Sequence, residues 1–365
     1  MSKRSLILGN GFGRVRPGSR SVEALRGFST TTDDDGEEES PAPAVETPAQ
    51  KLADATARGV GQVIFLGSPE AGKILGLALF VGDPFLGSMA VLGTLTATGA
   101  ATAAGLDEAS IGSGLLGYNG CLVGCAAAVF GAPSVLGATT ATVVGAAATP
   151  FVASSLKEAM GSVPQWTFAF NAVALTSLLK TRPLLEAAPP ADDLVAAAAT
   201  AAEPTASKGS LFADVLTSPL TGISQIFVVQ SPLSGAMILG GIGSYSPMLA
   251  LYALGGSTVG TLVGALGGAP VDEIAMGLYG FNSALTSMAV GVFFVHSTPS
   301  VLLGAGGAAA TASLFGAMKT VFGAYGAPCL TLPFCVTMSG CYMMRNHVPG
   351  LVLASSPHSP EKNEA

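Results

Sequence analysis

The chain alternates long apolar stretches with short polar breaks. Between Gly59 and Leu179 it carries only seven formally charged residues, which leaves stretches long enough to cross a hydrocarbon core of about 30 Å as helices. The pattern predicts helices over 60–82, 84–104, 119–131, 134–156 and 165–180. A shorter element over Glu108–Gly117 is predicted to enter the membrane from one side as a half-helix, because it is too short to span.

The second half of the chain repeats this pattern. Residues 61–130 align without a gap on residues 224–293, at a shift of 163 positions, with 19 identities in 70. The identities fall at the breaks: Gln62 matches Gln225, and Gly117-Tyr118-Asn119 matches Gly280-Phe281-Asn282 with only the central residue changed. Apolar halves broken at matching positions are typical of membrane transporters built from structural repeats, with the pathway between the halves.

Five full spans in each half is an odd number, so the second copy is predicted to enter the membrane from the opposite side. The expected fold is an all-α membrane protein with ten transmembrane helices and two re-entrant half-helices in two inverted-topology repeats. The predicted organisation is a disordered N-terminal segment over 1–58, a first repeat over 59–180, a connector over 181–215, a second repeat over 216–346 and a C-terminal tail over 347–365.

The composition agrees with a membrane location. Charged residues make up 11% of the chain and the mean hydropathy is +0.57, whereas a soluble globular domain has roughly 25% charged residues. The 48 glycines favour close helix packing, since small residues let helices approach one another in lipid. The net charge of −7 includes an acidic run over 33–39 and gives no support for nucleic-acid binding.

The N-terminal segment has a composition of its own. Up to Phe28 it carries six Lys or Arg residues against the single acid Glu23, and the acidic run then follows as a linker. An arginine- and serine-rich, acid-poor start is the composition of an organelle transit peptide, and a disordered cytoplasmic tail is the alternative. The expected location is the plasma membrane, or a mitochondrial or plastid membrane if residues 1–58 act as a transit peptide.

No enzyme chemistry or metal site is indicated. The five cysteines lie inside apolar segments, without a Cys-x-x-Cys pair or a nearby histidine cluster. Buried thiols are therefore the expectation, and no metal or other cofactor is predicted. No Ser/His/Asp or Cys/His arrangement suggests catalysis.

The repeat instead brings matched neutral residues to the breaks, where irregular backbone at membrane depth must be buried by protein or reached by water. The matched pairs are Gln62 with Gln225, Phe65 with Val228, Tyr118 with Phe281, Leu122 with Leu285 and Thr167 with Thr331. Leaving an amide-like group unpaired in an apolar site costs about 4–8 kcal/mol. Amide and hydroxyl oxygens are therefore predicted to replace water around a thin, planar, neutral solute, and ions meet no countercharge.

Each of these residues also has a structural interpretation. The glutamines can cap helices or join them, the aromatic residues and leucines can fill a core, and the threonines can bond to their own helix backbone. The repeat favours the pathway for the glutamines, because both halves carry one seven residues before a proline. For the threonines the repeat favours the pathway together with the recurring motif, whereas the aromatic residues and leucines by themselves are better explained as core packing.

Three segments of the second half resemble signature segments of the urea transporter family, and the first half carries weaker versions of each. The segments are Gln225-Ile226-Phe227 followed by Ser231-Pro232-Leu233-Ser234-Gly235, then Gly277-Leu278-Tyr279-Gly280-Phe281-Asn282-Ser283, then Cys329-Leu330-Thr331-Leu332-Pro333-Phe334-Cys335. The resemblance covers about residues 59–346. It implies a passive, channel-like urea permease in the lipid bilayer, usually a homotrimer with one pore per subunit, in which the residues paired above contact urea.

The first half departs from the family pattern at Glu70, Lys73, Leu116 and Ala169, so the resemblance defines the detailed selectivity less well than the fold. Two alternatives to a urea channel stay open. One is a channel for another small neutral solute, such as ammonia, an amide or water, and the other is an ion-coupled transporter. Ion coupling needs a carboxylate on the pathway, whereas the acids within the repeats lie near predicted helix ends.

Overall fold

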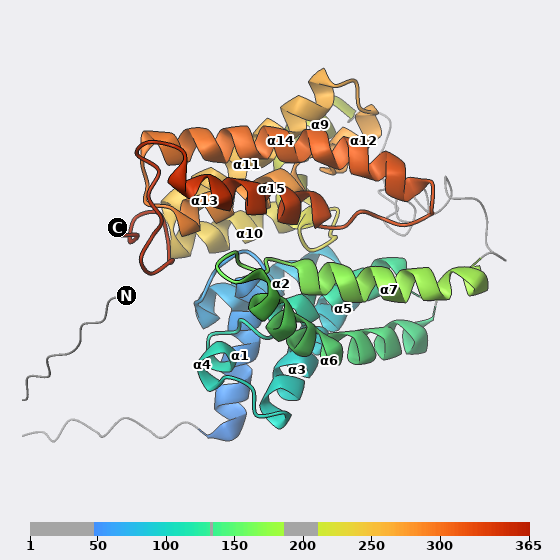
Figure 1. The fold of residues 1–365 in the computed structure, drawn as a ribbon. Coiled ribbons are helices and arrows are strands. Elements are labelled where there is room, and N and C mark those ends of the chain that lie inside the picture. Colours follow the sequence, from blue (N-terminus) through green and yellow to red (C-terminus); the bar gives the residue numbers. More distant parts are fainter. Residues whose placement is uncertain (1–46, 132–133, 186–210) are drawn as a thin grey trace, which may run out of the picture. The chain divides into compact units, whose positions relative to one another are not determined.

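The computed structural model describes residues 47–131, 134–185 and 211–365, and over these ranges it consists mainly of helices joined by short turns (Figure 1). Four helices are long and apolar enough to cross a membrane: α3 (Pro84–Ala103), α6 (Val135–Met160), α11 (Pro247–Leu266) and α14 (Thr298–Gly323). Three shorter apolar helical segments accompany them: α5 (Tyr118–Phe130), the part Phe168–Leu178 of α7 (Phe168–Leu185), and α13 (Phe281–Phe293). The protein is therefore a helical integral membrane protein, as its composition predicts.

The helices form two sets, one in each half of the chain. Each helix of the first set begins 163 residues before its counterpart, or 164 for the last pair. Besides α3 with α11, α5 with α13 and α6 with α14, the pairs are α1 (Pro48–Gln62) with α9 (Leu211–Gln225), α2 (Pro69–Gly82) with α10 (Pro232–Tyr245), α4 (Glu108–Gly112) with α12 (Val271–Ala275), and α7 with α15 (Leu332–Met343). A short 3-10 helix, Met344–Asn346, follows α15. The repeat in sequence is therefore also a repeat of helix order, and of helix length in every pair except α7 with α15.

The single helix predicted over 60–82 is wrong, because the chain forms two helices there. α1 ends at Gln62 and α2 begins at Pro69, after a turn in which Phe65 has a φ of 67°. A left-handed backbone interrupts the helical hydrogen-bond pattern, and Ser68 caps α2 by accepting from the backbone N–H of Ala71. The apolar sequence continues across this turn, so hydrophobicity alone does not reveal it.

Other predicted boundaries shift as well. α1 begins at Pro48 with a capping box formed by Thr47 and Gln50, so helix precedes the predicted boundary at residue 59. α4 ends at Gly112 rather than at Gly117, and α7 and α9 extend into the ends of the predicted connector. The transit-peptide and acidic-linker predictions, and most of the connector, lie outside the described residues.

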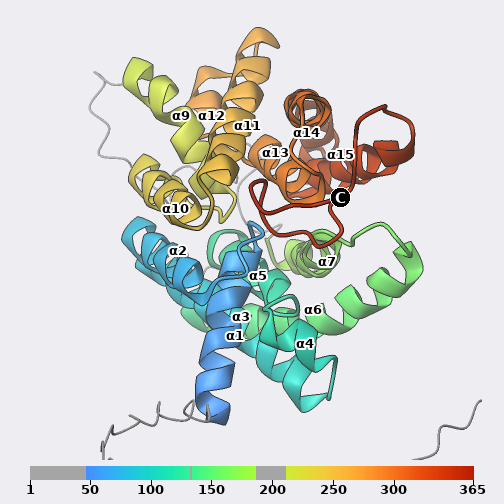
Figure 2. The same ribbon diagram turned by 90° about the vertical axis from the view of Figure 1, so that its left-hand side faces the viewer.

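The two halves contact each other mainly through two matched helix pairs: α2 packs against α10, and α7 packs against α15 (Figures 1 and 2). At the first contact, Ser234 Oγ donates to the carbonyl of Ala78 at 2.8 Å, and Leu75 is fully buried next to Gly241. The contacts within each half also match: α3 contacts α5 and α6, and its counterpart α11 contacts α13 and α14. Equivalent elements of the repeats therefore meet one another across the interface.

The C-terminal tail, residues 347–365, packs on the second half. The backbone N–H of Ala354 donates to the carbonyl of Phe293 at 3.0 Å. The side-chain amide of Asn363 donates to three carbonyls at the end of α13, those of Gly291, Val292 and Phe294. These hydrogen bonds satisfy carbonyls that a helix C-terminus leaves without an intrahelical partner.

The tail also supplies a carboxylate to the N-terminus of α11. Glu361 accepts from the hydroxyl of Ser246 at 2.6 Å and from the backbone N–H of Met248 at 2.7 Å. At the equivalent place before α3, Asp83 itself accepts from the backbone N–H groups of Phe85 and Leu86. Negative charge at a helix N-terminus is stabilising. The second repeat has serine where the first has aspartate, and the tail restores the carboxylate.

We expect the docking of the tail to weaken in acid. Burial would raise the pKa of Glu361, but hydrogen bonds from Ser246 and Met248 outweigh it and hold the pKa below the usual value of 4.5. A carboxylate whose pKa is lowered by folding stabilises the folded state at pH values above its pKa in the unfolded chain. This stabilisation is lost as the pH falls through its pKa in the folded protein. At pH values below 4.5, the protection of the Met248 amide from hydrogen exchange should therefore decrease. The Glu361→Gln variant should not show this decrease in acid. If the wild type and the variant lost protection equally at low pH, the role of Glu361 would be contradicted.

Candidate functional site at the contact between the repeats

Among the described residues, four residues other than glycine have a left-handed backbone, and they form two pairs related by the repeat. Phe65 and Val228 follow α1 and α9 with φ of 67° and 61°, and Trp166 and Leu330 precede α7 and α15 with φ of 47° and 50°. A bulky or β-branched residue in this region costs roughly 1–3 kcal/mol, and such strain is concentrated at functional sites. The same strain at equivalent positions makes these turns the candidate site.

The predicted glutamines end the helices before the first pair of strained turns. Gln62 is the last residue of α1 and Gln225 is the last of α9, and both side chains are half-buried. Gln62 Nε2 donates to the carbonyl of Ser113 at 3.0 Å. This side chain therefore also holds the turn that follows α4, and contact of the glutamines with a solute stays a prediction.

An aromatic cluster surrounds Phe65, which is half-buried. Its ring lies edge-on to those of Phe293 and Phe334, with ring centroids 6.2 and 6.3 Å apart. The ring of Trp166 lies edge-on to the same two rings, at 5.1 and 5.9 Å. Sequence reasoning identifies Phe65 and misses the other three, because they are distant in the chain and only the fold brings them together. Val228, the equivalent of Phe65, is also half-buried.

The predicted residues that begin α5 and α13 differ in their surroundings. Tyr118 is buried, and its hydroxyl donates to the carbonyl of Trp166 and accepts from Gln165 Nε2. Phe281 is half-buried, and its ring centroid is 5.7 Å from that of Phe315. The predicted pair one helical turn further along is buried in the hydrophobic core: Leu122 and Leu285. Contact of this pair with a solute stays a prediction.

The two predicted threonines meet where α7 and α15 begin. Thr167 directly precedes α7, Thr331 is the N-cap of α15, and their hydroxyl oxygens are 2.7 Å apart. Each residue is 3% exposed. The repeat therefore brings one neutral polar group from each half to the same buried point, which we call the threonine pair.

One helical turn beyond each threonine lies a residue that the sequence prediction omits: Asn171 in α7 and Cys335 in α15. Asn171 Nδ2 donates to Thr331 Oγ1 at 2.8 Å, and Cys335 Sγ lies 3.1 Å from Thr167 Oγ1. A spacing of four residues places a side chain on the same helix face as the threonine before it. That spacing, at matched positions of the repeat, is the signal that points to them.

Two amide oxygens beside the threonine pair are buried without a hydrogen-bond partner within the described ranges: Gln165 Oε1 and Asn282 Oδ1. Gln165 lies two residues before Thr167, and Asn282 Nδ2 donates at 3.1 Å to the carbonyl of Leu330, the neighbour of Thr331. Buried acceptors without a partner are few in native proteins and each has a reason. An N–H group of a ligand would satisfy an acceptor of this kind.

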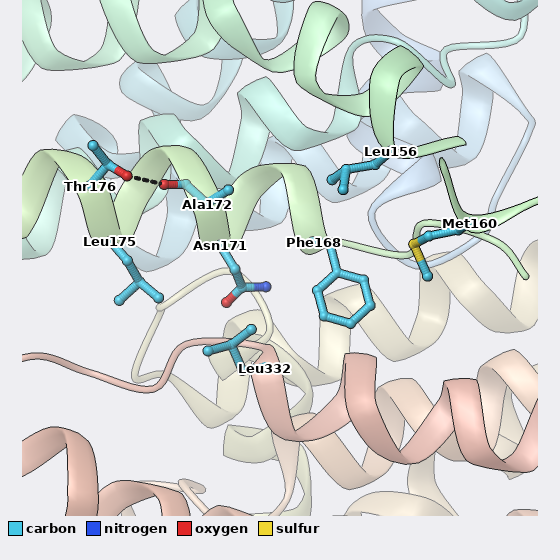
Figure 3. A pocket seen from close by; sticks show the side chains of 8 residues that line it. All are labelled: Leu156, Met160, Phe168, Asn171, Ala172, Leu175, Thr176 and Leu332. Atoms are coloured by element: carbon cyan, nitrogen blue, oxygen red, sulfur yellow. Dashed lines mark hydrogen bonds between the residues drawn. The ribbon is translucent and has the colours of Figure 1, made fainter. Parts of the chain in front are cut away.

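A hollow of about 490 Å³ adjoins this cluster (Figure 3). It is lined by the end of α6, one face of α7 and Leu332 at the start of α15. The side chain of Asn171 extends from α7 toward Leu332. Phe168 and Leu332, which directly follow the two threonines, both line the hollow. Asn171 therefore connects the hollow with the threonine pair.

The candidate site is neutral. In the part of the chain that the structure describes, the buried polar side chains are threonine, serine and asparagine, with no buried Asp, Glu, Lys, Arg or His. Over the same residues, no group of three His, Cys, Asp or Glu side chains is arranged to hold a metal ion. The five cysteines are free and buried, as predicted.

A helical membrane protein with two structural repeats that meet at a neutral polar cluster is a membrane transport protein of the repeat-built class. The sequence matches the family described as Urea transporter over residues 53–346. The chain therefore belongs to the urea transporter family, and the prediction made from its three motifs is confirmed.

Similarity to curated proteins agrees with this membership. The chain is 30% identical to Urea transporter 1 of Ovis aries over 294 residues. The aligned region covers 79% of this chain and 76% of that protein. It is also 30% identical to Urea transporter 1 of Rattus norvegicus over 285 residues, and this aligned region covers 76% of this chain and 73% of that protein.

Proposed function

We propose that this protein is a passive, channel-like pathway for urea across a membrane. Membership of the urea transporter family and the names of its relatives support urea as the solute. The observation that carries the proposal is the contact between Thr167 and Thr331, since it joins matched neutral polar groups from both halves. The protein is a transporter and not an enzyme.

The chemistry of the candidate site suits urea. Urea is a flat, uncharged diamide with four N–H donors and one carbonyl acceptor. Hydroxyl and amide oxygens at the threonine pair accept hydrogen bonds, and the rings of Phe65, Phe293 and Phe334 offer flat apolar surface nearby. Each hydrogen bond returns on the order of 1 kcal/mol net. A solute can therefore exchange one partner for the next without being trapped.

We infer that the two repeats have inverted topology, with the pathway between them. Support comes from the way equivalent elements face each other: α2 contacts α10, α7 contacts α15, and Thr167 contacts Thr331. A two-fold axis in the membrane plane relates inverted repeats and brings equivalent elements together near the midplane.

We infer that the two re-entrant half-helices are among the matched helices too short to cross the hydrocarbon core, and are not the elements after Asp107 and Pro270. α4 has five residues and none of them is buried, so the half-helix predicted over Glu108–Gly117 is replaced by a short surface helix and turns. α2 and α10 have 14 residues each and α5 and α13 have 13, which at 1.5 Å per residue is shorter than a hydrocarbon core of about 30 Å.

The assembly and the membrane are proposed from the family resemblance and the N-terminal composition. We propose a homotrimer with one pathway per subunit, embedded in the plasma membrane or in a mitochondrial or plastid membrane. Imaging the chain with and without residues 1–58 distinguishes these membranes, because an organelle signal in that segment is required for organelle targeting.

Urea uptake by vesicles that carry the purified chain tests the proposed function. We expect uptake down the urea gradient, well above that of protein-free vesicles and independent of a sodium or proton gradient, since the described residues include no buried carboxylate. Uptake that requires either gradient would favour an ion-coupled transporter. Flux of ammonia or water without urea would favour a channel for another neutral solute.

A further inference from the structure

We propose that Asn171 sets the direction of the hydrogen bonds at the threonine pair, so that the pair offers only acceptors to a passing solute. The inference deepens the proposed urea function and rests on it. Asn171 is then a positioning residue, and through the two hydroxyls it determines selectivity for solutes that carry N–H groups.

The backbone partners of Asn171 determine the orientation of its amide. Nδ2 donates to the carbonyl of Thr167 at 2.8 Å, and Oδ1 accepts from the backbone N–H of Thr331 at 3.2 Å. The reverse orientation would place two acceptors together and two donors together. The second N–H of the amide is therefore the donor to Thr331 Oγ1, also at 2.8 Å.

A directed chain of hydrogen bonds follows from this orientation. Thr331 Oγ1 accepts from Asn171, so its own proton is available to Thr167 Oγ1 at 2.7 Å. Thr167 Oγ1 in turn donates to Cys335 Sγ at 3.1 Å, because a thiol is a weak donor and ends the chain as an acceptor. Both hydroxyl protons are thereby engaged inside the cluster. Each hydroxyl oxygen keeps one lone pair for a solute.

The unpaired amide oxygens point to the same conclusion independently. Gln165 Oε1 and Asn282 Oδ1 have no partner among the described residues, and both side chains belong to the surroundings of the threonine pair. Both of these unpaired amide groups are oxygen acceptors. An N–H group of a solute satisfies such an acceptor, whereas a methyl group in the same place leaves it unpaired.

The repeat explains why one asparagine is better than two. Asn171 and Cys335 occupy equivalent positions, each four residues after its threonine. Two asparagines would donate to both hydroxyls and leave one hydroxyl proton with no acceptor except the solute. A thiol at the second position accepts a hydrogen bond and so preserves a single direction along the chain.

Exchange of the two equivalent residues tests this inference. We expect N171C to lower urea flux into vesicles roughly tenfold, the effect of about one lost hydrogen bond to two. In the double variant N171C/C335N, the amide moves to the other repeat and donates to Thr167, and the chain runs in the opposite direction. Urea flux should then recover to within about twofold of the wild type, because the two changes are coupled and not additive.

A second readout separates positioning from a structural defect, and it does not require the double variant to fold. In N171C no amide donor fixes the direction of the chain, so a threonine hydroxyl can rotate and present its proton to a solute carbonyl. The ratio of urea flux to acetamide flux should therefore fall by roughly threefold or more. A structural defect would slow both solutes alike. An unchanged ratio, or a folded double variant as slow as N171C, overturns the inference. Wild-type vesicles without urea flux would overturn the proposed function instead.

Discussion

The isosteric substitution Thr331→Val is expected to slow urea flux roughly 10- to 100-fold while the protein still folds. Valine keeps the volume of the side chain but removes Oγ1, which accepts from Asn171 and lies 2.7 Å from Thr167 Oγ1. A urea molecule that has shed its water then lacks an acceptor at this point. An unsatisfied polar group in a dry site costs about 1–3 kcal/mol, which corresponds to roughly one to two powers of ten in rate.

Thr94→Val is the matched control for this prediction. Thr94 is fully buried in α3, but its hydroxyl donates to the carbonyl of Ala90 in its own helix at 2.7 Å. Stopped-flow urea uptake by vesicles with equal amounts of each protein measures the effect. Vesicles with T94V should take up urea at the wild-type rate. If vesicles with T331V also took up urea at that rate, the role of the threonine pair would be contradicted. T167V should also be slow, and the double variant less than additive, since the two hydroxyls interact.

The second large effect is expected on stability, from Gly72→Ala in α2. A Cβ atom at this position would lie 1.8 Å from the carbonyl oxygen of Ala57 in α1, and the equivalent Gly235 in α10 would place one 1.9 Å from the carbonyl oxygen of Leu220. The obstacle is backbone, so the two helices must separate to admit a methyl group. Overpacking of this kind destabilises by about 3 kcal/mol or prevents folding.

Gly76 provides a control in the same helix, one turn later. A Cβ atom there has no neighbour within 4 Å, and alanine has the higher helix propensity. G76A should therefore be neutral or stabilising by up to about 1 kcal/mol. Thermal unfolding of the detergent-solubilised variants compares the two. If G72A unfolded at the same temperature as G76A, the close approach of α1 and α2 would not exist. Of these two glycines, only Gly72 lies in tight contact with a neighbouring helix.

Buried asparagines explain how the strained turns keep the threonines in place. Asn119 Oδ1 in α5 accepts from the backbone N–H of Phe170 at 3.1 Å, and the equivalent Asn282 in α13 donates to the carbonyl of Leu330 at 3.1 Å. Asn282 thus anchors the residue directly before Thr331, and Asn119 anchors the first turn of α7, three residues after Thr167. Strain persists only where the surrounding structure over-determines it, and these contacts provide that restraint in both halves.

Helical class, membrane location, repeat and family can all be read from the sequence, because each follows from local chain chemistry. The length of an apolar stretch predicts a helix in lipid, and prolines and asparagines mark the ends of helices. The helix predicted over 84–104 is α3 at Pro84–Ala103, and that over 119–131 is α5 at Tyr118–Phe130. Duplication adds to this information, since the same residue at equivalent positions identifies the breaks that matter.

The partners within the site depend on packing between distant segments, which no local pattern encodes. Asn171 and Thr331 are 160 positions apart, and Trp166 and Phe293 come from different halves. Helix contacts select these neighbours by shape and by the need to pair buried polar groups. The turn at Phe65 has the same origin, because a strained backbone inside an apolar stretch persists only when tertiary contacts hold it.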